Sequence, residues 1–194
     1  MRNKIFIVKT NEVFKEMPVL ISAAAVQLSF GLDKYLLPHY KYIQIYSEEY
    51  FADGDSFRVL AGHVSNETIT VAWNHFYNGY LIPDNGINVG LHEMAHALYF
   101  QRIVARKIYE RLAFKKQFAN VDAACSKYHA LRSCRYELYK ENAFKNLQEF
   151  WADSVELFFE KPLELKRCYP DVYAQLSLLL NQDPGLAHNS IHIS

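Results

Sequence analysis

The sequence predicts an α+β fold in which a small, mostly antiparallel sheet precedes a predominantly helical region. Segments of the first half alternate in polarity or are rich in β-branched and aromatic residues, as strands are: "YKYIQIYS" (40–47), "FRVLAGHV" (57–64) and "ETITVAW" (67–73). From residue 87 onward, apolar residues recur at helical spacing. With 194 residues, 51% of them hydrophobic, the chain is expected to form one domain over 1–194 with a sizeable core.

The remaining elements follow from local signals along the chain. Residues 11–31 have apolar positions at helical spacing and predict a helix that ends at Gly31. "SN" (65–66) predicts a turn between the second and third strands, and "NGYLIPDNG" (78–86) predicts a loop. After the helix that begins near residue 87, further helices punctuated by two prolines are expected at 102–119, 121–139, 146–160 and 169–181.

Two apolar segments near the start are too short for a signal peptide or a membrane span. "IFIV" (5–8) is shorter than the apolar region of a signal peptide. "VLISAAAVQLSF" (19–30) spans 12 residues, whereas a membrane helix needs about 20. We therefore expect a buried helix at 19–30 and a cytoplasmic protein, with a membrane tether upstream of this chain left open.

Charge and cysteine content disfavour several classes of protein. Lys+Arg and Asp+Glu both number 21, and a net charge of zero argues against a broad nucleic-acid-binding surface. Cys125, Cys134 and Cys168 form no CxxC pair, which disfavours a disulfide framework and a thiolate metal site. No nucleic-acid partner is therefore expected, and the thiols are expected to be reduced.

The segment "LHEMAHALYF" (91–100) carries the motif HExxH on a predicted helix. Residues four apart lie on one face of a helix, so His92 and His96 can bind one ion. Glu93 is rotated by about 100°, which lets its carboxylate reach a water molecule at that ion instead of the ion itself. The motif predicts a zinc ion with Glu93 as general base. The alternative is a core helix with two partly buried histidines.

A catalytic zinc ion needs a third protein ligand. Tyr99 and Arg102 stand where metzincins have glycine and histidine, so that class is excluded. "NLQEFWADSVELFFEKP" (146–162) is the candidate segment, because aromatic residues cover much of its helix and buried carboxylates need partners or a metal. Glu149 suits a ligand, and Asp153 suits a hydrogen-bond acceptor behind a ligand histidine. The alternative is a solvated acidic face.

Two blocks of the sequence resemble the Mlc titration factor A family (MtfA, the DgsA anti-repressor) of zinc-dependent peptidases. They are "WNHFYNGYLIPDNGINVGLHEMAHAL" and "EFWADSVELFFEKP", and "VLISAAAVQLSFGLDKY" (19–35) is similar to the segment before the family's first strand. The resemblance implies a zincin-like fold with a gluzincin-like site. His92, His96 and Glu149 match the zinc ligands, and Glu93 matches the base. Glu156 matches a second glutamate of the later block, next to the ligand shell.

The family also implies an activity and a partner. Members are peptidases that act on a peptide or protein substrate, and some bind a sugar-responsive transcriptional repressor. We therefore expect a zinc metallopeptidase. The alternative is a regulatory protein on a zincin scaffold that binds a repressor and has weak or no peptidase activity.

The chain departs from the family pattern at two positions. Tyr99 replaces a common aspartate, and Asn142 replaces a tyrosine seven residues before the glutamate ligand. An asparagine amide can donate to an oxyanion, so Asn142 is a candidate catalytic residue. Tyr139 and Tyr136 lie upstream and are candidates to replace the missing tyrosine, the alternative being that neither has a catalytic task. A further hypothesis places the strand 67–73 at the cleft, where it would pair with an extended substrate.

Overall fold

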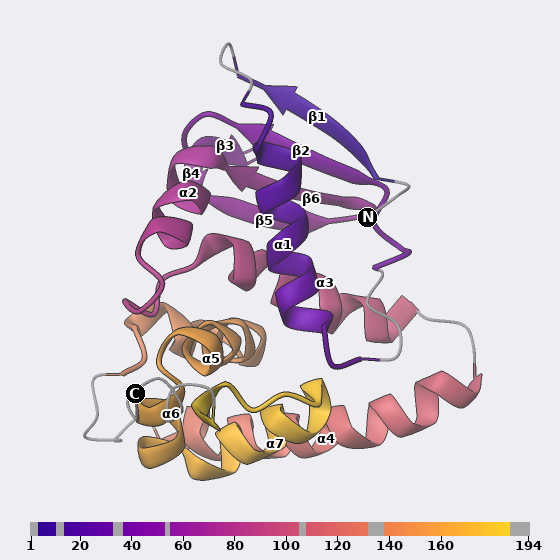
Figure 1. Ribbon diagram of the computed structural model, residues 1–194, viewed down its shortest axis with the longest axis vertical. Helices are drawn as coiled ribbons and strands as arrows, with labels where there is room; N and C mark the ends of the chain where they lie inside the picture. Colours follow the sequence, from indigo (N-terminus) through magenta and orange to yellow (C-terminus); the bar gives the residue numbers. More distant parts are fainter. Residues whose placement is uncertain are drawn as a thin grey trace.

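The computed structural model describes residues 4–10, 14–32, 37–52, 55–104, 108–131 and 138–186. A sheet forms one layer, helix α3 runs beneath it, and the remaining C-terminal helices pack on the other side of α3 (Figure 1). Helix α1 crosses in front of the sheet and contacts α3. The predicted α+β class, with strands first and helices after, is confirmed.

The main sheet has the strand order β1-β2-β6-β5. Its strands are β1 (Ile5–Lys9), β2 (Tyr42–Tyr46), β6 (Thr68–Ala72) and β5 (Gly62–Ser65). β1 pairs parallel with β2, and β2 pairs parallel with β6, while only β5 runs antiparallel to its neighbour β6. The expectation of a mostly antiparallel sheet is therefore wrong for this sheet. The parallel pairing arises because helix α1 connects β1 to β2, and parallel neighbours need such a crossover.

The predicted strand at 57–64 is two strands. β4 (Asp55–Leu60) pairs with β3 (Tyr50–Ala52) in a separate antiparallel sheet, and β5 begins after Ala61 in the main sheet. The predicted turn at 65–66 joins β5 to β6, and Asn66 adopts a left-handed conformation there with φ 47°. Asparagine tolerates this conformation better than most residues, which explains its place in the turn.

The helices of the described residues are α1 (Met17–Ser29), α2 (Trp73–Leu81), α3 (Val89–Val104), α4 (Ile108–Leu131), the 3-10 helix η1 (Glu141–Lys145), α5 (Leu147–Glu160), α6 (Pro162–Cys168) and α7 (Pro170–Leu180). α4 covers parts of both predicted helices, 102–119 and 121–139. It continues without interruption through residue 120, where a break between them was expected. α2, η1 and α6 were not predicted. The end of α2 occupies the first part of the predicted loop at 78–86. Near the start of α2, Trp73 stacks on Phe76.

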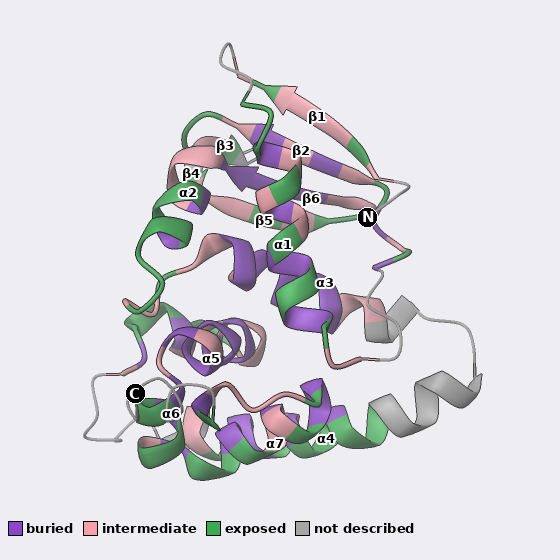
Figure 2. Cartoon of the chain, in the orientation of Figure 1, coloured by how far each residue is buried: buried purple, intermediate pink, exposed green. Residues whose placement is uncertain are grey.

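The core joins α3 and α5, which carry the predicted site residues. α5 is buried along most of its length (Figure 2). Trp151 on α5 is fully buried, and its indole Nε1–H donates to the carbonyl of Ala95 on α3 at 2.9 Å. Its ring also packs against Phe118 at 4.7 Å. Burying one large apolar side chain contributes about 1.5–3 kcal/mol, so this contact holds the two helices in a defined register.

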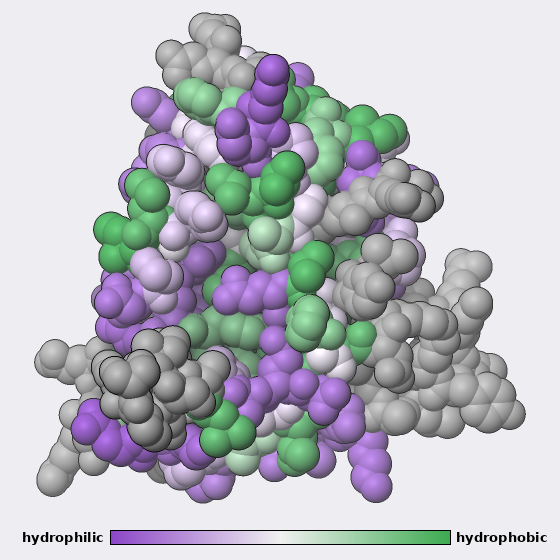
Figure 3. All heavy atoms as spheres, in the orientation of Figure 1, coloured by the Kyte–Doolittle hydropathy of each residue, from purple (hydrophilic) through white to green (hydrophobic). Residues whose placement is uncertain are grey.

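The surface mixes polar and apolar side chains, as on most globular proteins (Figure 3). No helix within the described parts of the chain has the length and hydropathy needed to cross a membrane.

Cys125 is buried and Cys168 is partly buried, both as free thiols. Burial raises the pKa of Cys125 to about 12, which makes this thiol unreactive at neutral pH. Cys134 lies outside the described residues.

Candidate metal centre

The segment before α3 is held by carboxylates of α5. The N–H groups of Gly86 and Ile87 donate to Glu160 Oε2 at 2.8 and 3.0 Å, and the N–H of Asn88 donates to Glu156 Oε2 at 2.5 Å. Asn88 in turn accepts the N–H of Leu91 at 3.0 Å through its side chain, as a residue that caps a helix does. These bonds fix where α3 begins and therefore where its first turns point.

His92, His96 and Glu149 converge at one point between α3 and α5. The two imidazole Nε2 atoms are 3.1 Å apart. Glu149 Oε2 lies 3.3 Å from His92 Nε2, and Glu149 Oε1 lies 3.6 Å from His96 Nε2. Ligand atoms at about 2.0–2.1 Å from a tetrahedral zinc ion are about 3.3 Å from one another. Each histidine is close to a different oxygen of the Glu149 carboxylate, and the separations of 3.1–3.6 Å are near the spacing of ligand atoms around one zinc ion.

The other nitrogen of His92 faces two more carboxylates. Nδ1 of His92 is 2.5 Å from Glu156 Oε1 and 3.3 Å from Asp153 Oδ1. Carboxylates in this position orient a metal-binding imidazole and fix its tautomer. The same Nδ1 with Asp153 and Glu156 also forms a triad of metal-ligand types. Both acids thus face the side of the His92 ring opposite to the Nε2 that meets His96 and Glu149.

Burial and charge act in opposite directions on this cluster. Burial alone lowers the pKa of His92, but the hydrogen bonds that its ring donates to Asp153, Glu149 and Glu156 raise it well above its usual value. Hydrogen bonds from His92 and His96 hold the pKa of Glu149 well below its usual range. A metal needs a neutral imidazole, so a bound cation would displace the proton of His92 and take over its role of neutralising the carboxylates.

Glu93 is buried beside His92 and His96, but its carboxylate is not one of the three groups that converge there. It is 5% exposed, and its Oε2 has no hydrogen-bond partner among the described groups. Burial raises the pKa of Glu93 to about 8, although the charge of His92 opposes this rise. A buried, unpaired carboxylate oxygen calls for a water molecule or an ion as partner. A nearby divalent cation lowers the pKa of such a carboxyl and so favours its basic form.

Strand β5 packs against Glu93 from the side of the sheet. A Cβ added to Gly62 would lie 2.4 Å from Glu93 Oε1 and 2.6 Å from its Cγ, so the carboxylate rests directly on the glycine backbone. The sequence offered no signal for this contact, because it joins a strand and a helix that are distant along the chain. Gly62 therefore sets the position of the Glu93 side chain.

Replacing Gly62 with alanine is expected to displace Glu93 and to lower any hydrolytic rate by about 10- to 100-fold, as a 1 Å misplacement does. Metal content is expected to stay at the wild-type level, because the three atoms nearest to the added Cβ all belong to Glu93. Peptide cleavage and elemental analysis of the same protein sample would measure both. Cleavage at the wild-type rate in a folded Gly62→Ala protein would contradict the supporting role.

Of the other predicted site residues, Asn142 borders the cluster of His92, His96 and Glu149, whereas Tyr139 lies in the core. The amide of Asn142, on η1, donates to Glu149 Oε2 at 3.4 Å, so this residue borders the cluster. Tyr139 does not reach it, since its ring stacks on Phe150 at 4.3 Å and its hydroxyl bonds Ser154 Oγ at 2.7 Å in the core. The geometry thus gives Tyr139 a packing role in place of the expected catalytic one. Tyr136 lies outside the described residues.

The fold shows where Tyr99 lies and corrects one further expectation. Tyr99 is buried against the rings of Phe100 and Phe118, where an aspartate would lack water. The strand at 67–73 is not the edge of the sheet, because β6 is paired on both sides by β2 and β5. The edge strand is instead β5, which lies next to α3. It takes this place because the expected strand 57–64 is divided into β4 and β5, and β5 pairs with β6.

The donor set suits zinc. Two imidazole nitrogens and one carboxylate oxygen are the ligands of many catalytic zinc sites, which leave a fourth position open. Glu93 Oε2 and His96 Nδ1 are buried polar atoms without a protein partner in the described part of the chain. The residues present therefore fit a zinc ion.

Comparisons with known proteins give a family and a similar fold. The family model described as glucose-regulated metallo-peptidase M90 matches residues 1–180. The solved structure of the PRO-PRO endopeptidase PPEP-2 from Paenibacillus alvei has a TM-score of 0.51 at 15% sequence identity, covering 90% of this chain and 96% of that chain. At this identity the likeness concerns the fold. No curated protein sequence matches the chain.

Proposed function

The chain belongs to the glucose-regulated metallopeptidase M90 family, as its resemblance to the Mlc titration factor A family predicts, and on that premise we propose that it is a zinc-dependent peptidase. His92, His96 and Glu149 would hold the ion. The observation that carries the proposal is the convergence of the two imidazole Nε2 atoms and the two oxygens of the Glu149 carboxylate, at separations of 3.1–3.6 Å, with a buried and unpaired Glu93 oxygen beside them.

A bound zinc ion would supply Lewis acidity, polarising the peptide carbonyl and lowering the pKa of a water molecule toward about 7. The carboxylate of Glu93 accepts the proton of the attacking water and delivers it to the leaving amine. Asp153 and Glu156 hold His92 Nδ1 and thereby keep its Nε2 directed at Glu149. The amide of Asn142 is positioned at the rim to donate a hydrogen bond to the developing oxyanion.

The purified protein is expected to contain about one zinc ion per chain. A chelator should remove the ion and abolish peptide cleavage, and added zinc should restore it. At free zinc 100-fold above Kd, unfolding should cost about 2.7 kcal/mol more than without metal. Elemental analysis, a peptide-library cleavage screen and thermal unfolding measure the three effects. A protein that is metal-free under all conditions, or that cleaves equally well with chelator, would refute the proposal.

A second candidate function is binding of a transcriptional repressor with weak or no cleavage. It is favoured by Asn142, whose amide stands in place of the family's tyrosine hydroxyl, and by Tyr139, whose hydroxyl is engaged in the core. Pull-down with a sugar-responsive repressor, using wild type and Glu93→Gln, distinguishes the two. Equal repressor binding by both proteins, without cleavage of any peptide by the wild type, would favour this second function.

A further inference from the structure

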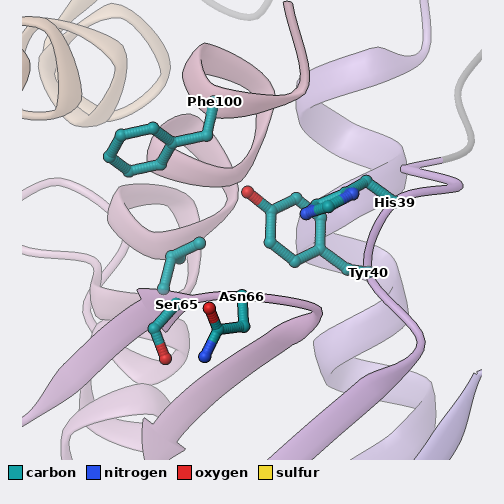
Figure 4. A pocket seen from close by; sticks show the side chains of 6 residues that line it. His39, Tyr40, Ser65, Asn66 and Phe100 are labelled. Atoms are coloured by element: carbon teal, nitrogen blue, oxygen red, sulfur yellow. The ribbon is translucent and has the colours of Figure 1, made fainter. Parts of the chain in front are cut away.

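Next to the candidate metal centre lies a cavity of about 230 Å³, which we call the Tyr40 pocket (Figure 4). It is lined by His39, Tyr40, Val64, Ser65, Asn66 and Phe100. We propose that the Tyr40 pocket is a subsite that takes one aromatic or large aliphatic side chain of the peptide substrate, two or three residues from the scissile bond. The proposal rests on the proposed peptidase function and specifies its substrate class.

The size of the pocket suits a side chain better than a whole ligand. Pockets that enclose complete small molecules have volumes of roughly 300–1,000 Å³. The Tyr40 pocket, at about 230 Å³, falls below that range. A single substrate side chain, with the rest of the peptide lying outside, is the occupant that this volume favours.

The pocket adjoins the metal centre from two directions. Phe100 follows His96 by one turn of α3, and the two rings stack at 6.3 Å. On the other side, Val64 and Ser65 follow Gly62, whose backbone supports Glu93. Strands rise about 3.3 Å per residue, so the pocket begins about 7–10 Å from the level of Glu93. A peptide extended along the β5 edge therefore brings a side chain two or three residues from the scissile bond to this pocket.

The apolar part of the lining favours apolar occupants. Val64, Phe100 and the ring of Tyr40 form apolar walls, and His39, Ser65 and Asn66 form the polar part of the lining. Among the described residues that line the pocket, none carries a carboxylate, ammonium or guanidinium group. Tyr40 is 1% exposed, and Figure 4 shows its hydroxyl directed toward Phe100. Burial raises the pKa of Tyr40 to about 12, so this hydroxyl stays neutral. A charged substrate side chain would lose its hydration here without gaining a counter-charge.

The wall that carries Tyr40 is fixed by contacts on both sides. The N–H of His39 donates to Gln101 Oε1 on α3 at 3.2 Å, and the His39 ring packs edge-on against Tyr40 at 5.1 Å. The Lys4 ammonium donates to the carbonyls of Leu37 and Tyr40. These contacts join the segment before β2 to α3 and to the start of β1. The pocket is thus formed before a substrate arrives, as binding pockets usually are.

The test uses peptide binding and cleavage in parallel. Glu93→Gln protein is presented with a display library of random peptides, and wild type with the same library as free peptides. One library position should prefer Phe, Tyr, Leu and Met over Asp, Glu, Lys and Gly by about 10- to 100-fold in Kd. Cleavage by the wild type should fall two or three residues from that position.

Val64→Trp fills the pocket and should remove the preference at that position while leaving the other positions unchanged. The matched control is Val19→Trp, because Val19 is 67% exposed on α1 and is not one of the residues that line the pocket. The control should keep the preference. Persistence of the preference in Val64→Trp, its absence in the parent, or the absence of any bound peptide overturns the subsite.

The same experiment separates the subsite from the peptidase function. If the wild type cleaves peptides and no position shows the apolar preference, the subsite fails and the function stands. If peptides are bound with the preference and Val64→Trp removes it, while the wild type cleaves nothing, the subsite stands and the peptidase function fails.

Discussion

Replacing Glu93 with glutamine is expected to reduce peptide hydrolysis by about 100- to 10,000-fold, the contribution of a positioned general base. Glutamine has nearly the same shape and can rest on Gly62 as glutamate does, but its amide cannot accept the proton of the attacking water. The loss should appear in kcat more than in KM, because the proton transfer belongs to the transition state. Steady-state kinetics on a cleaved library peptide measures both.

Two controls accompany Glu93→Gln. Its zinc content should equal that of the wild type, because Glu93 is not one of the three converging groups. Glu164→Gln, an exposed exchange of the same chemistry on α6, should leave hydrolysis unchanged. If Glu93→Gln cleaves peptides as fast as the wild type, the assignment of the general base is wrong. If it loses zinc as well, Glu93 acts as a ligand and the mechanism must be revised.

His92→Ala is expected to have the second large effect, the loss of the metal. Changing a residue that only orients a ligand typically costs 10- to 100-fold in metal affinity, so removing a ligand should cost more than about 100-fold. The variant also leaves Glu149, Asp153 and Glu156 without the cation that neutralises them. Zinc titration should therefore show no stoichiometric binding at concentrations that saturate the wild type, and hydrolysis should be absent.

His75→Ala is the matched control for this change. His75 is half-exposed and pairs with Glu49, and it belongs to neither group of possible metal ligands found among the described residues. Its replacement should leave one zinc ion per chain and an unchanged cleavage rate. Stoichiometric zinc in His92→Ala would remove His92 from the ligand set. Zinc loss in both histidine variants would mean that general destabilisation, and not the removal of a ligand, empties the site.

The fold could be predicted best where the signal is local. The alternation in 40–47 and 67–73 predicts two strands, and β2 and β6 lie inside those ranges. The predicted helix at 146–160 corresponds to α5, whose N-cap Asn146 accepts N–H groups of its first turn. β1 was missed because five residues carry too weak a pattern. α2 was missed because the glycine and proline signals at its end outweighed the stacking of Trp73 on Phe76, which depends on tertiary packing.

In the candidate metal centre, too, some features follow from local sequence patterns and others depend on tertiary packing. The four-residue spacing of His92 and His96 on α3 follows from helix geometry, and so does the row of carboxylates on α5. Local periodicity therefore suffices to show which side chains share a face, although their metal-binding role stays a prediction. Three contacts follow from tertiary packing instead: Glu93 rests on Gly62, Glu160 holds the segment before α3, and β5 forms the edge of the sheet. These contacts join residues far apart in the chain, and helical or strand periodicity carries no information about which distant element a face will meet.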